Sequence, residues 1–205
     1  MSIMRVSVFL FLLIMMVELI YPHPVIWKGG QVINSVFKEN QLHLNYHYSL
    51  TNKHAIGIHY LSNDSNSYAM FQSNYLLKRW NKRHSQANIY VKTGLGIETD
   101  DSQNGLFHLG IQADWETLYY YTQLQFDTFQ TRNSFTMGNF RVGFSPYQAE
   151  YDEIQTWLIL QLDYNSLNPG KLIPIPMIRV FKQNFLIEFG YDFIDNYLVT
   201  IMYHF

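Results

Sequence analysis

The stretch LHLNYHYSL, residues 42–50, decides the fold, because its side chains alternate strictly between apolar and polar. The apolar set is Leu42, Leu44, Tyr46, Tyr48 and Leu50, and the polar set between them is His43, Asn45, His47 and Ser49. A period of two is the signature of a β-strand whose two faces meet different surroundings. The same alternation recurs at 87–98, 107–116, 185–193 and 197–205. The sequence therefore predicts an all-β protein.

Composition indicates what covers the apolar faces. Hydrophobic residues make up 48% of the chain and charged residues 15%, whereas an average soluble domain carries about 25% charged residues. The opposite faces are rich in Gly, Asn, Gln and Asp, which suits a polar lumen better than the aliphatic interior of a β-sandwich. An open strand edge would leave unpaired backbone groups in hydrocarbon. We therefore predict a closed transmembrane barrel, up-and-down and antiparallel, with lipid on its outside.

Turn signals divide the chain into about twelve strands. Two of them alternate poorly, 67–80 and 171–182, and in the second Pro174 and Pro176 each remove a backbone donor, so we expect a bulge or a barrel rim there. A count of ten strands also fits the pattern. The expected boundaries are 30–38, 41–50, 54–62, 67–80, 86–98, 104–116, 117–130, 134–147, 153–165, 171–182, 184–193 and 196–205.

The N-terminus has the pattern of an export signal. Arg5 supplies a positive charge, and 6–17 is apolar apart from Ser7, which is about the length of a signal-peptide hydrophobic region. We expect cleavage between Glu18 and Pro24, and so divide the chain into a leader at 1–22 and one barrel domain at 23–205. A retained anchor is the alternative. His23, near the expected mature N-terminus, is expected to be exposed.

The last residues resemble the assembly signature of bacterial outer-membrane proteins. The ending Tyr203-His204-Phe205 follows apolar residues at alternate positions. This resemblance implies an outer-membrane location, with membrane lipid and the barrel insertion machinery as partners, the latter reading Tyr203 and Phe205. Four short stretches are also similar to a small uncharacterised outer-membrane family, which assigns no residue a role: Trp27-Lys28-Gly29-Gly30, Leu76-Leu77-Lys78-Arg79-Trp80-Asn81, Ser85-Gln86-Ala87-Asn88-Ile89-Tyr90 and Ala113-Asp114-Trp115-Glu116.

Charged side chains on the inward faces suggest the first functional reading. A mildly acidic lumen would favour cations, and it fits a narrow channel or transport-associated barrel. The same side chains could instead pair and fill the lumen, giving a structural or interaction barrel without transport. The inward residues that carry this prediction are Lys92, Asp114, Glu116, Asp127, Arg141, Glu188 and Asp192; Glu98 and Asp163 share their parity.

Histidines suggest a second site. His43 and His47 lie about 13 Å apart along one strand, but a hairpin turn at 51–53 would set His59 opposite Asn45 and diagonal to both. A transition metal could then bind His43, His47 and His59; otherwise they are ordinary lumen residues and no cofactor is expected. The chain has no cysteine, which excludes thiolate chemistry and disulfides.

Two further readings complete the set. A lipid-modifying enzyme would need a Ser nucleophile beside a His base; His108 and Ser134 are the candidates, but no motif links them, and catalysis is not expected. Basic residues at 78–84 should form a solvated turn, with contact to phospholipid headgroups as the alternative. The net charge of -2 gives no basic excess for nucleic acid.

Overall fold

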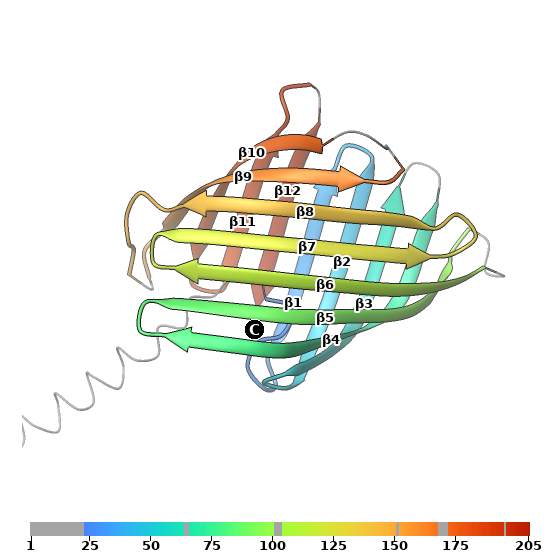
Figure 1. Ribbon diagram of the computed structural model, residues 1–205, viewed down its shortest axis with the longest axis horizontal. Helices are drawn as coiled ribbons and strands as arrows, with labels where there is room; N and C mark the ends of the chain where they lie inside the picture. Colours follow the sequence, from blue (N-terminus) through green and yellow to red (C-terminus); the bar gives the residue numbers. More distant parts are fainter. Residues whose placement is uncertain (1–22, 64–65, 101–103, 151, 168–171, 195) are drawn as a thin grey trace, which may run out of the picture.

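The computed structural model describes residues 23–63, 66–100, 104–150, 152–167, 172–194 and 196–205. Within these ranges the chain forms twelve antiparallel strands, each hydrogen-bonded to the strands before and after it (Figure 1). The predicted all-β barrel of about twelve strands is thus confirmed, and the count of ten is not found. The strands are β1 (Gln31–Lys38), β2 (Gln41–Thr51), β3 (His54–Asn63), β4 (Ser67–Lys82), β5 (Ser85–Glu98), β6 (Gly105–Thr117), β7 (Tyr120–Gln130), β8 (Phe135–Phe144), β9 (Gln155–Asn165), β10 (Leu172–Lys182), β11 (Phe185–Tyr191) and β12 (Tyr197–His204).

The barrel closes where β1 pairs with β12. Gln31 N donates to Phe205 O over 2.7 Å, and Phe205 N donates back to Gln31 O over 3.0 Å. The start of β1 and the end of β12 therefore share one end of the barrel, which we call the terminus end. The connections at the other end, which we call the far end, are all short, none longer than 99–104 and 166–171.

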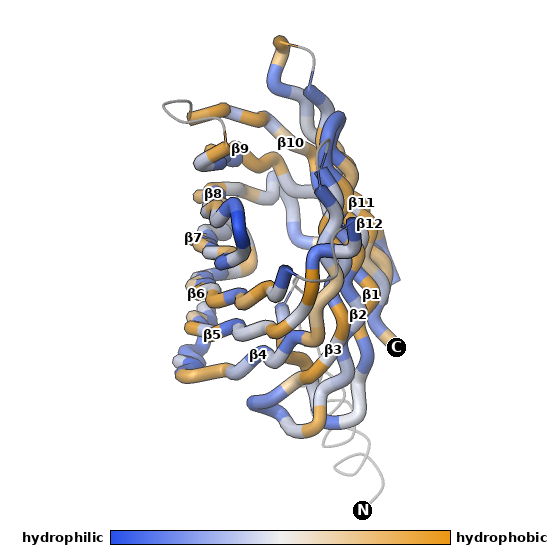
Figure 2. The backbone as a smooth tube through the Cα atoms, turned by 90° about the vertical axis from the view of Figure 1, so that its right-hand side faces the viewer, coloured by the Kyte–Doolittle hydropathy of each residue, from blue (hydrophilic) through white to orange (hydrophobic). Residues whose placement is uncertain are grey.

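The cross-section is flattened. In Figure 2, strands β4 to β9 form one wall and β11, β12, β1, β2 and β3 form the facing wall, with β10 joining them at one edge. Side chains from opposite walls can therefore meet across a narrow lumen. This shape explains why many lumenal side chains have partners on strands that are not their neighbours.

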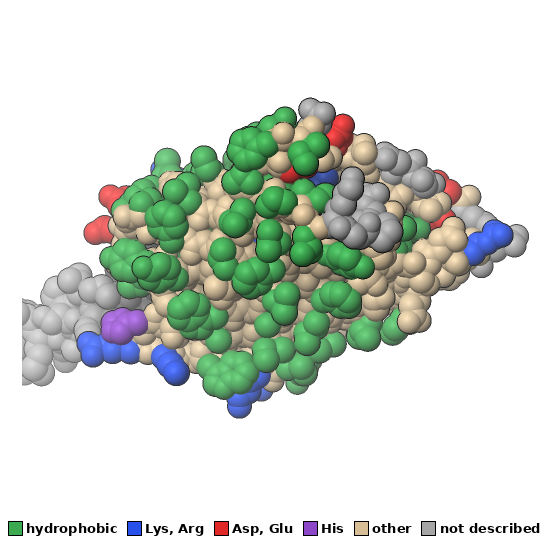
Figure 3. Space-filling view, turned by 45° about the horizontal axis from the view of Figure 1, so that its top comes forward, with side chains coloured by type: hydrophobic (Ala, Val, Ile, Leu, Met, Phe, Trp, Pro, Cys, Tyr) green, Lys and Arg blue, Asp and Glu red, His purple; other side chains and the backbone are tan. Residues whose placement is uncertain are grey.

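The two faces of each strand differ as the alternation predicted. Large apolar side chains stay exposed on the outside, among them Ile58 at 62%, Leu95 at 69% and Tyr120 at 61%. Figure 3 shows hydrophobic side chains spread over one face of the barrel. Their inward neighbours are buried, and about half of the buried residues are polar or charged. Searching the described residues for helices finds none with the length and hydropathy to cross a bilayer.

Two strands alternate poorly for local reasons that the structure shows. In β4 the register shifts between Leu76 and Lys78, so the bulge at Leu77 changes which side chains face inward beyond it. In β10 the half that contains Pro174 and Pro176 pairs with β9, whereas pairing with β11 starts only at Met177. The prolines therefore occupy a rim, where a missing ladder donor is tolerated.

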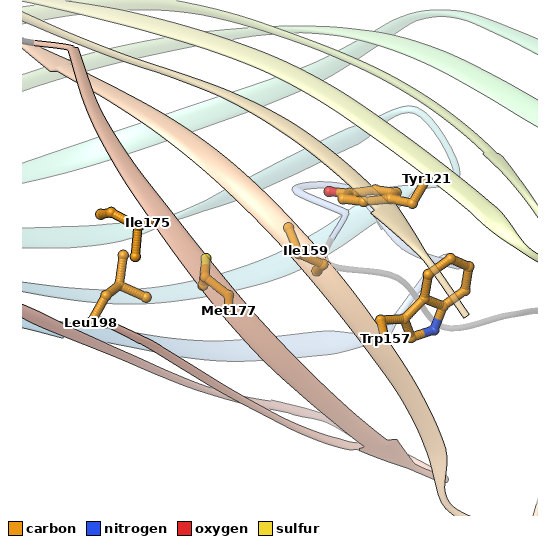
Figure 4. Close-up of a cluster of buried hydrophobic side chains, with 6 residues drawn as sticks. All are labelled: Tyr121, Trp157, Ile159, Ile175, Met177 and Leu198. Carbon is orange, nitrogen blue, oxygen red and sulfur yellow. The ribbon is translucent and has the colours of Figure 1, made fainter. Parts of the chain in front are cut away.

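Part of the lumen is apolar. Tyr121, Trp157, Ile159, Ile175, Met177 and Leu198 form one buried cluster (Figure 4). Nearer the far end, a second cluster joins Leu61, Tyr68, Met70, Leu106, Phe129 and Phe135. These clusters narrow the barrel and leave a polar cavity between its walls.

Candidate functional site

The candidate site is this lumenal cavity, which has a volume of about 210 Å³. Its lining includes three basic residues, Lys38, Lys92 and Arg141, and three acidic ones, Asp127, Asp163 and Glu188. Amide side chains from both walls are the most frequent type in the remaining lining, which also includes histidines and a few apolar residues. The cavity is therefore polar and close to neutral in charge.

Lys92 and Asp127 form the first ion pair, with Lys92 Nζ 2.7 Å from Asp127 Oδ1. They lie on β5 and β7, and Gly110 of β6 is the register partner of both. A side chain at Gly110 would occupy the space of the pair, because its Cβ would lie 2.1 Å from Asp127 Oδ1. The glycine thus lets two charges meet over the strand that separates them.

A hydrogen-bond chain extends from this pair across the lumen. His108 Nε2 donates to Asp127 Oδ1 over 2.8 Å, so its Nδ1 is the acceptor for Gln72 Nε2 at 3.3 Å. Gln72 Oε1 in turn lies 2.8 Å from His47 Nε2, which donates to it. The directions of all three bonds agree, and the chain fixes the orientation of every member.

Glu188 lies between two arginines. Arg179 binds its Oε1 at 2.7 Å from the neighbouring strand, and Arg141 reaches the same oxygen at 3.3 Å from β8. The Arg179 guanidinium also lies 4.6 Å from the ring centre of Tyr121. Both Arg179 and Glu188 are only 1% exposed. This network is therefore a buried set of contacts that connects β7, β8, β10 and β11.

The third ion pair joins Lys38 on β1 to Asp163 on β9. These strands are separated by β10, β11 and β12 in the sheet, so the pair spans the lumen between the two walls. It lies toward the far end, where β1 ends and β9 ends. The contact limits the width of any path through the cavity.

The histidines take the predicted register but not a metal-binding geometry. Asn45 pairs with His59, as the hairpin argument required, and the rings of His43 and His59 stack with centroids 5.5 Å apart. His47 is held by Gln72 instead. Among the described residues no three His, Asp or Glu side chains form a group able to hold a metal ion. Metal binding stays a prediction of the sequence.

The segment 23–30 crosses the terminus end, and here the expectation for His23 was wrong. Its side chain is only 10% exposed and lies 3.7 Å from both Asp114 and Glu116 of β6. Val25 is buried against Ala55, Leu76 and Tyr90. Backbone groups fix the rest: Ile26 N donates to Ser49 Oγ at 3.1 Å and Gly29 N to Ser49 O at 2.8 Å. The apolar–polar alternation begins only after residue 30, so the sequence carried no signal for the packing of this segment.

Burial and the two carboxylates act in opposite directions on His23. Burial lowers the pKa of its imidazole, but the hydrogen bonds and charges of Asp114 and Glu116 outweigh this and raise the pKa to about 9. The imidazole is therefore protonated at neutral pH. Its positive charge offsets part of the negative charge of Asp114 and Glu116.

The remaining predicted residues are distributed over the barrel. The side chains of Lys92, Asp114, Glu116, Asp127, Glu188 and Asp192 are buried, and Arg141 is partly buried. Asp192 is at the far end, where its Oδ1 accepts from the backbone N of Ile194 and Asn196. Tyr203 and Phe205 point outward, each 43% exposed. Sequence reasoning missed Arg179. Both faces of β10 are largely apolar, so the sequence pattern does not show which face of the strand points inward.

The two other readings find little geometric support. His108 is bonded to Asp127 and Gln72, while Ser134 Oγ donates to Thr131 O at 3.0 Å, so the proposed nucleophile and base have separate partners. The basic residues 78–84 are exposed around the β4–β5 hairpin at the terminus end. Arg79 Nε there donates to Asn88 Oδ1 over 2.6 Å.

Comparison with known proteins identifies the fold. No family model and no curated protein matches the sequence. Two structures of the KdgM porin, one in complex with disordered oligogalacturonate, each align with a TM-score of 0.51 and 9% identity, over 85% of this chain and 98% of the porin. A loop-deletion mutant of OmpT, an outer membrane protein of Vibrio cholerae, aligns with a TM-score of 0.29 and 8% identity, over 86% of this chain and 97% of that one.

These findings define the class of protein. At 9% identity the likeness to the KdgM porin shows a shared fold. A closed strand ladder with an apolar outer surface and a polar interior is the architecture of transmembrane β-barrels. The chain is a small β-barrel of the outer-membrane type.

Proposed function

We propose that the chain is a narrow passive channel in the outer membrane of a Gram-negative bacterium, exported behind the leader at 1–22. The observation that carries this proposal is the polar cavity of about 210 Å³ enclosed by the closed ladder. The likeness of the fold to the KdgM porin supports a channel rather than another use of a barrel. The leader lies outside the described residues and rests on the sequence alone.

The charge distribution supports weak cation selectivity. Within the cavity each carboxylate has a cationic partner. Further buried carboxylates lie toward the two ends, with Asp114 and Glu116 beside His23 at the terminus end and Glu98 and Asp192 at the far end. Acidic residues at an entrance raise the local cation concentration without binding ions tightly along the path.

The test is reconstitution into planar bilayers and liposomes. We expect small single-channel conductance with a modest cation preference in a KCl gradient, and swelling of liposomes in glycerol but not in a trisaccharide. Replacing Lys38 and Asp163 together by Ala removes the bridge between the walls and should raise the conductance. The exposed Lys82→Ala is the matched control, which should conduct like the native barrel.

A second candidate is a barrel with a filled lumen and no transport. It is favoured by the cross-lumen contacts, namely the bridge between Lys38 and Asp163 and the stacking of Arg179 on Tyr121. The same experiment separates the two candidates. Absence of conductance and swelling in both the native protein and the Lys38/Asp163 double variant would contradict the channel and leave the filled barrel.

A further inference from the structure

The walls of the lumenal cavity carry buried polar atoms that have no partner in the described structure. Among them are Asn34 Oδ1, Asn139 Oδ1, Gln161 Oε1 and both ring nitrogens of His59, together with Asn74 Oδ1 and the donor Arg141 Nε. All of these residues line the cavity, and Gln161 is only 1% exposed. A buried polar group without a partner bears its whole desolvation cost. These atoms are therefore poised for a hydrogen-bonding molecule inside the cavity.

These atoms belong to both walls of the cavity. Asn34 and His59 lie on β1 and β3, whereas Asn139 and Gln161 lie on β8 and β9. The bridge between Lys38 and Asp163 holds the walls together beside them, since Asp163 is the register partner of Asn139. A molecule in the cavity can therefore touch both walls at once.

The orientation of Gln161 is fixed by its neighbour. Its Nε2 donates to Asp163 Oδ1 over 2.5 Å. Because the amide nitrogen makes this hydrogen bond, the amide oxygen Oε1 is the group available to the cavity. An amide oxygen can only accept a hydrogen bond. Asn34 and Asn139 also offer carbonyl oxygens. The complementary ligand thus brings several O–H donors.

Charge and size narrow the class of ligand further. Lys38, Lys92 and Arg141 of the lining each have a carboxylate partner, so a charged ligand would have to compete with these ion pairs. The volume of about 210 Å³ limits the ligand to a small molecule. The stacked rings of His43 and His59 add a flat surface against which C–H groups can pack.

We propose that the lumen contains a binding site for a small uncharged polyhydroxyl compound, of the size of a sugar alcohol or a monosaccharide. Asn34, Asn139 and Gln161 accept hydrogen bonds from its hydroxyl groups, and His59 binds from the facing wall. The inference goes beyond conduction, because a closed lumen could hold the same ligand as an open one. If the channel conducts, this site selects which solutes bind in the lumen.

The test is saturation-transfer NMR on the full barrel in detergent, with sorbitol and glucose as uncharged probes and glucuronate as the charged comparison. We expect transfer to sorbitol or glucose and none to glucuronate. Gln161→Leu, which removes the acceptor at similar volume, should weaken binding about tenfold. Gln148→Leu is the matched control, because Gln148 is exposed in the connection between β8 and β9.

The outcomes are separable from those of the channel test. Absence of transfer to either uncharged probe overturns the site, and so does equal binding by Gln161→Leu and Gln148→Leu. Because leucine at a buried site could unfold the barrel, the gel mobility of unboiled Gln161→Leu is checked first, and Asn34→Ser serves as a second variant with the same expected loss. Binding without conductance would contradict the channel and support the binding site. Conductance without binding would support the channel and contradict the binding site.

Discussion

Lys92 Nζ lies 2.7 Å from Asp127 Oδ1 although β6 runs between their strands. The pair exists because β6 carries Gly110 at the register position between them, with no side chain to separate the charges. His108 and Gln72 then extend the contact toward His47. One glycine thus decides whether the hydrogen-bond chain in the lumen can form.

We expect Gly110→Ala to destabilise the barrel, because the new Cβ would lie 2.1 Å from Asp127 Oδ1 and 2.9 Å from Lys92 Cε. Overpacking of this kind costs about 1–3 kcal/mol. Urea unfolding in lipid vesicles measures the loss. Gly105→Ala on the same strand is the control, since nothing lies within 4 Å of its added Cβ. Equal stability of the two variants would refute the role of Gly110.

Glu188→Gln should be strongly destabilising, because it leaves Arg179 and Arg141 without their shared carboxylate. Removing one partner of a buried ion pair costs about 3–5 kcal/mol. The exposed Glu39→Gln is the charge-matched control. Combining Glu188→Leu with Arg179→Met and Arg141→Met removes all three charges and should recover most of the loss in the same unfolding assay. Failure to recover would show that the network acts by more than charge pairing.

Docking of the segment 23–30 should weaken at alkaline pH. The pKa of His23 is raised from 6.5 to about 9, so its contribution to stability is complete below pH 6.5 and is lost as the pH rises through about 9. The charged or titratable groups that face it are Asp114 and Glu116 of β6, Tyr90 of β5 and His204 of β12. We therefore expect conductance to increase between pH 8 and pH 10 as the terminus end opens.

The comparison that isolates His23 uses His23→Gln, which should already conduct at pH 7 as the native protein does at high pH. His84→Gln, in the exposed hairpin between β4 and β5, keeps the native pH profile. Native, His23→Gln and His84→Gln barrels with the same pH dependence would exclude His23 as the titrating group. This pairing is needed because Lys and Tyr side chains also titrate near pH 10.

Removal of Phe205 should reduce assembly several-fold in cells. Phe205 completes the seam with Gln31 and its ring lies 5.3 Å from that of Tyr203. The measurement is the fraction of protein in the outer membrane that changes gel mobility on boiling. Phe193→Ala, at an exposed position of the far end, is the control. Native levels of folded barrel without Phe205 would remove the proposed assembly signal.

The leader gives the last prediction. Mass spectrometry of protein purified from the outer membrane should find a mature N-terminus between residues 18 and 24, because the apolar stretch 6–17 is too short for a stable span. An intact N-terminus would indicate a retained anchor instead. The result also fixes how much chain precedes the docked His23.

The sequence by itself determined the fold class and, in the strands that alternate cleanly, which side chains face inward, as the match of 42–50 to β2 and the pairing of Asn45 with His59 illustrate. These features follow from a period of two and from turns, which are local properties of the chain. The sequence left ten or twelve strands open. Only the tertiary structure decided which inward side chains meet: Lys38 with Asp163, His23 with Asp114 and Glu116, and Arg179 with Tyr121. Such partners lie on strands that are not neighbours, and their distance depends on the bulge in β4, the rim in β10 and the flattening of the whole barrel, which no single stretch of residues encodes.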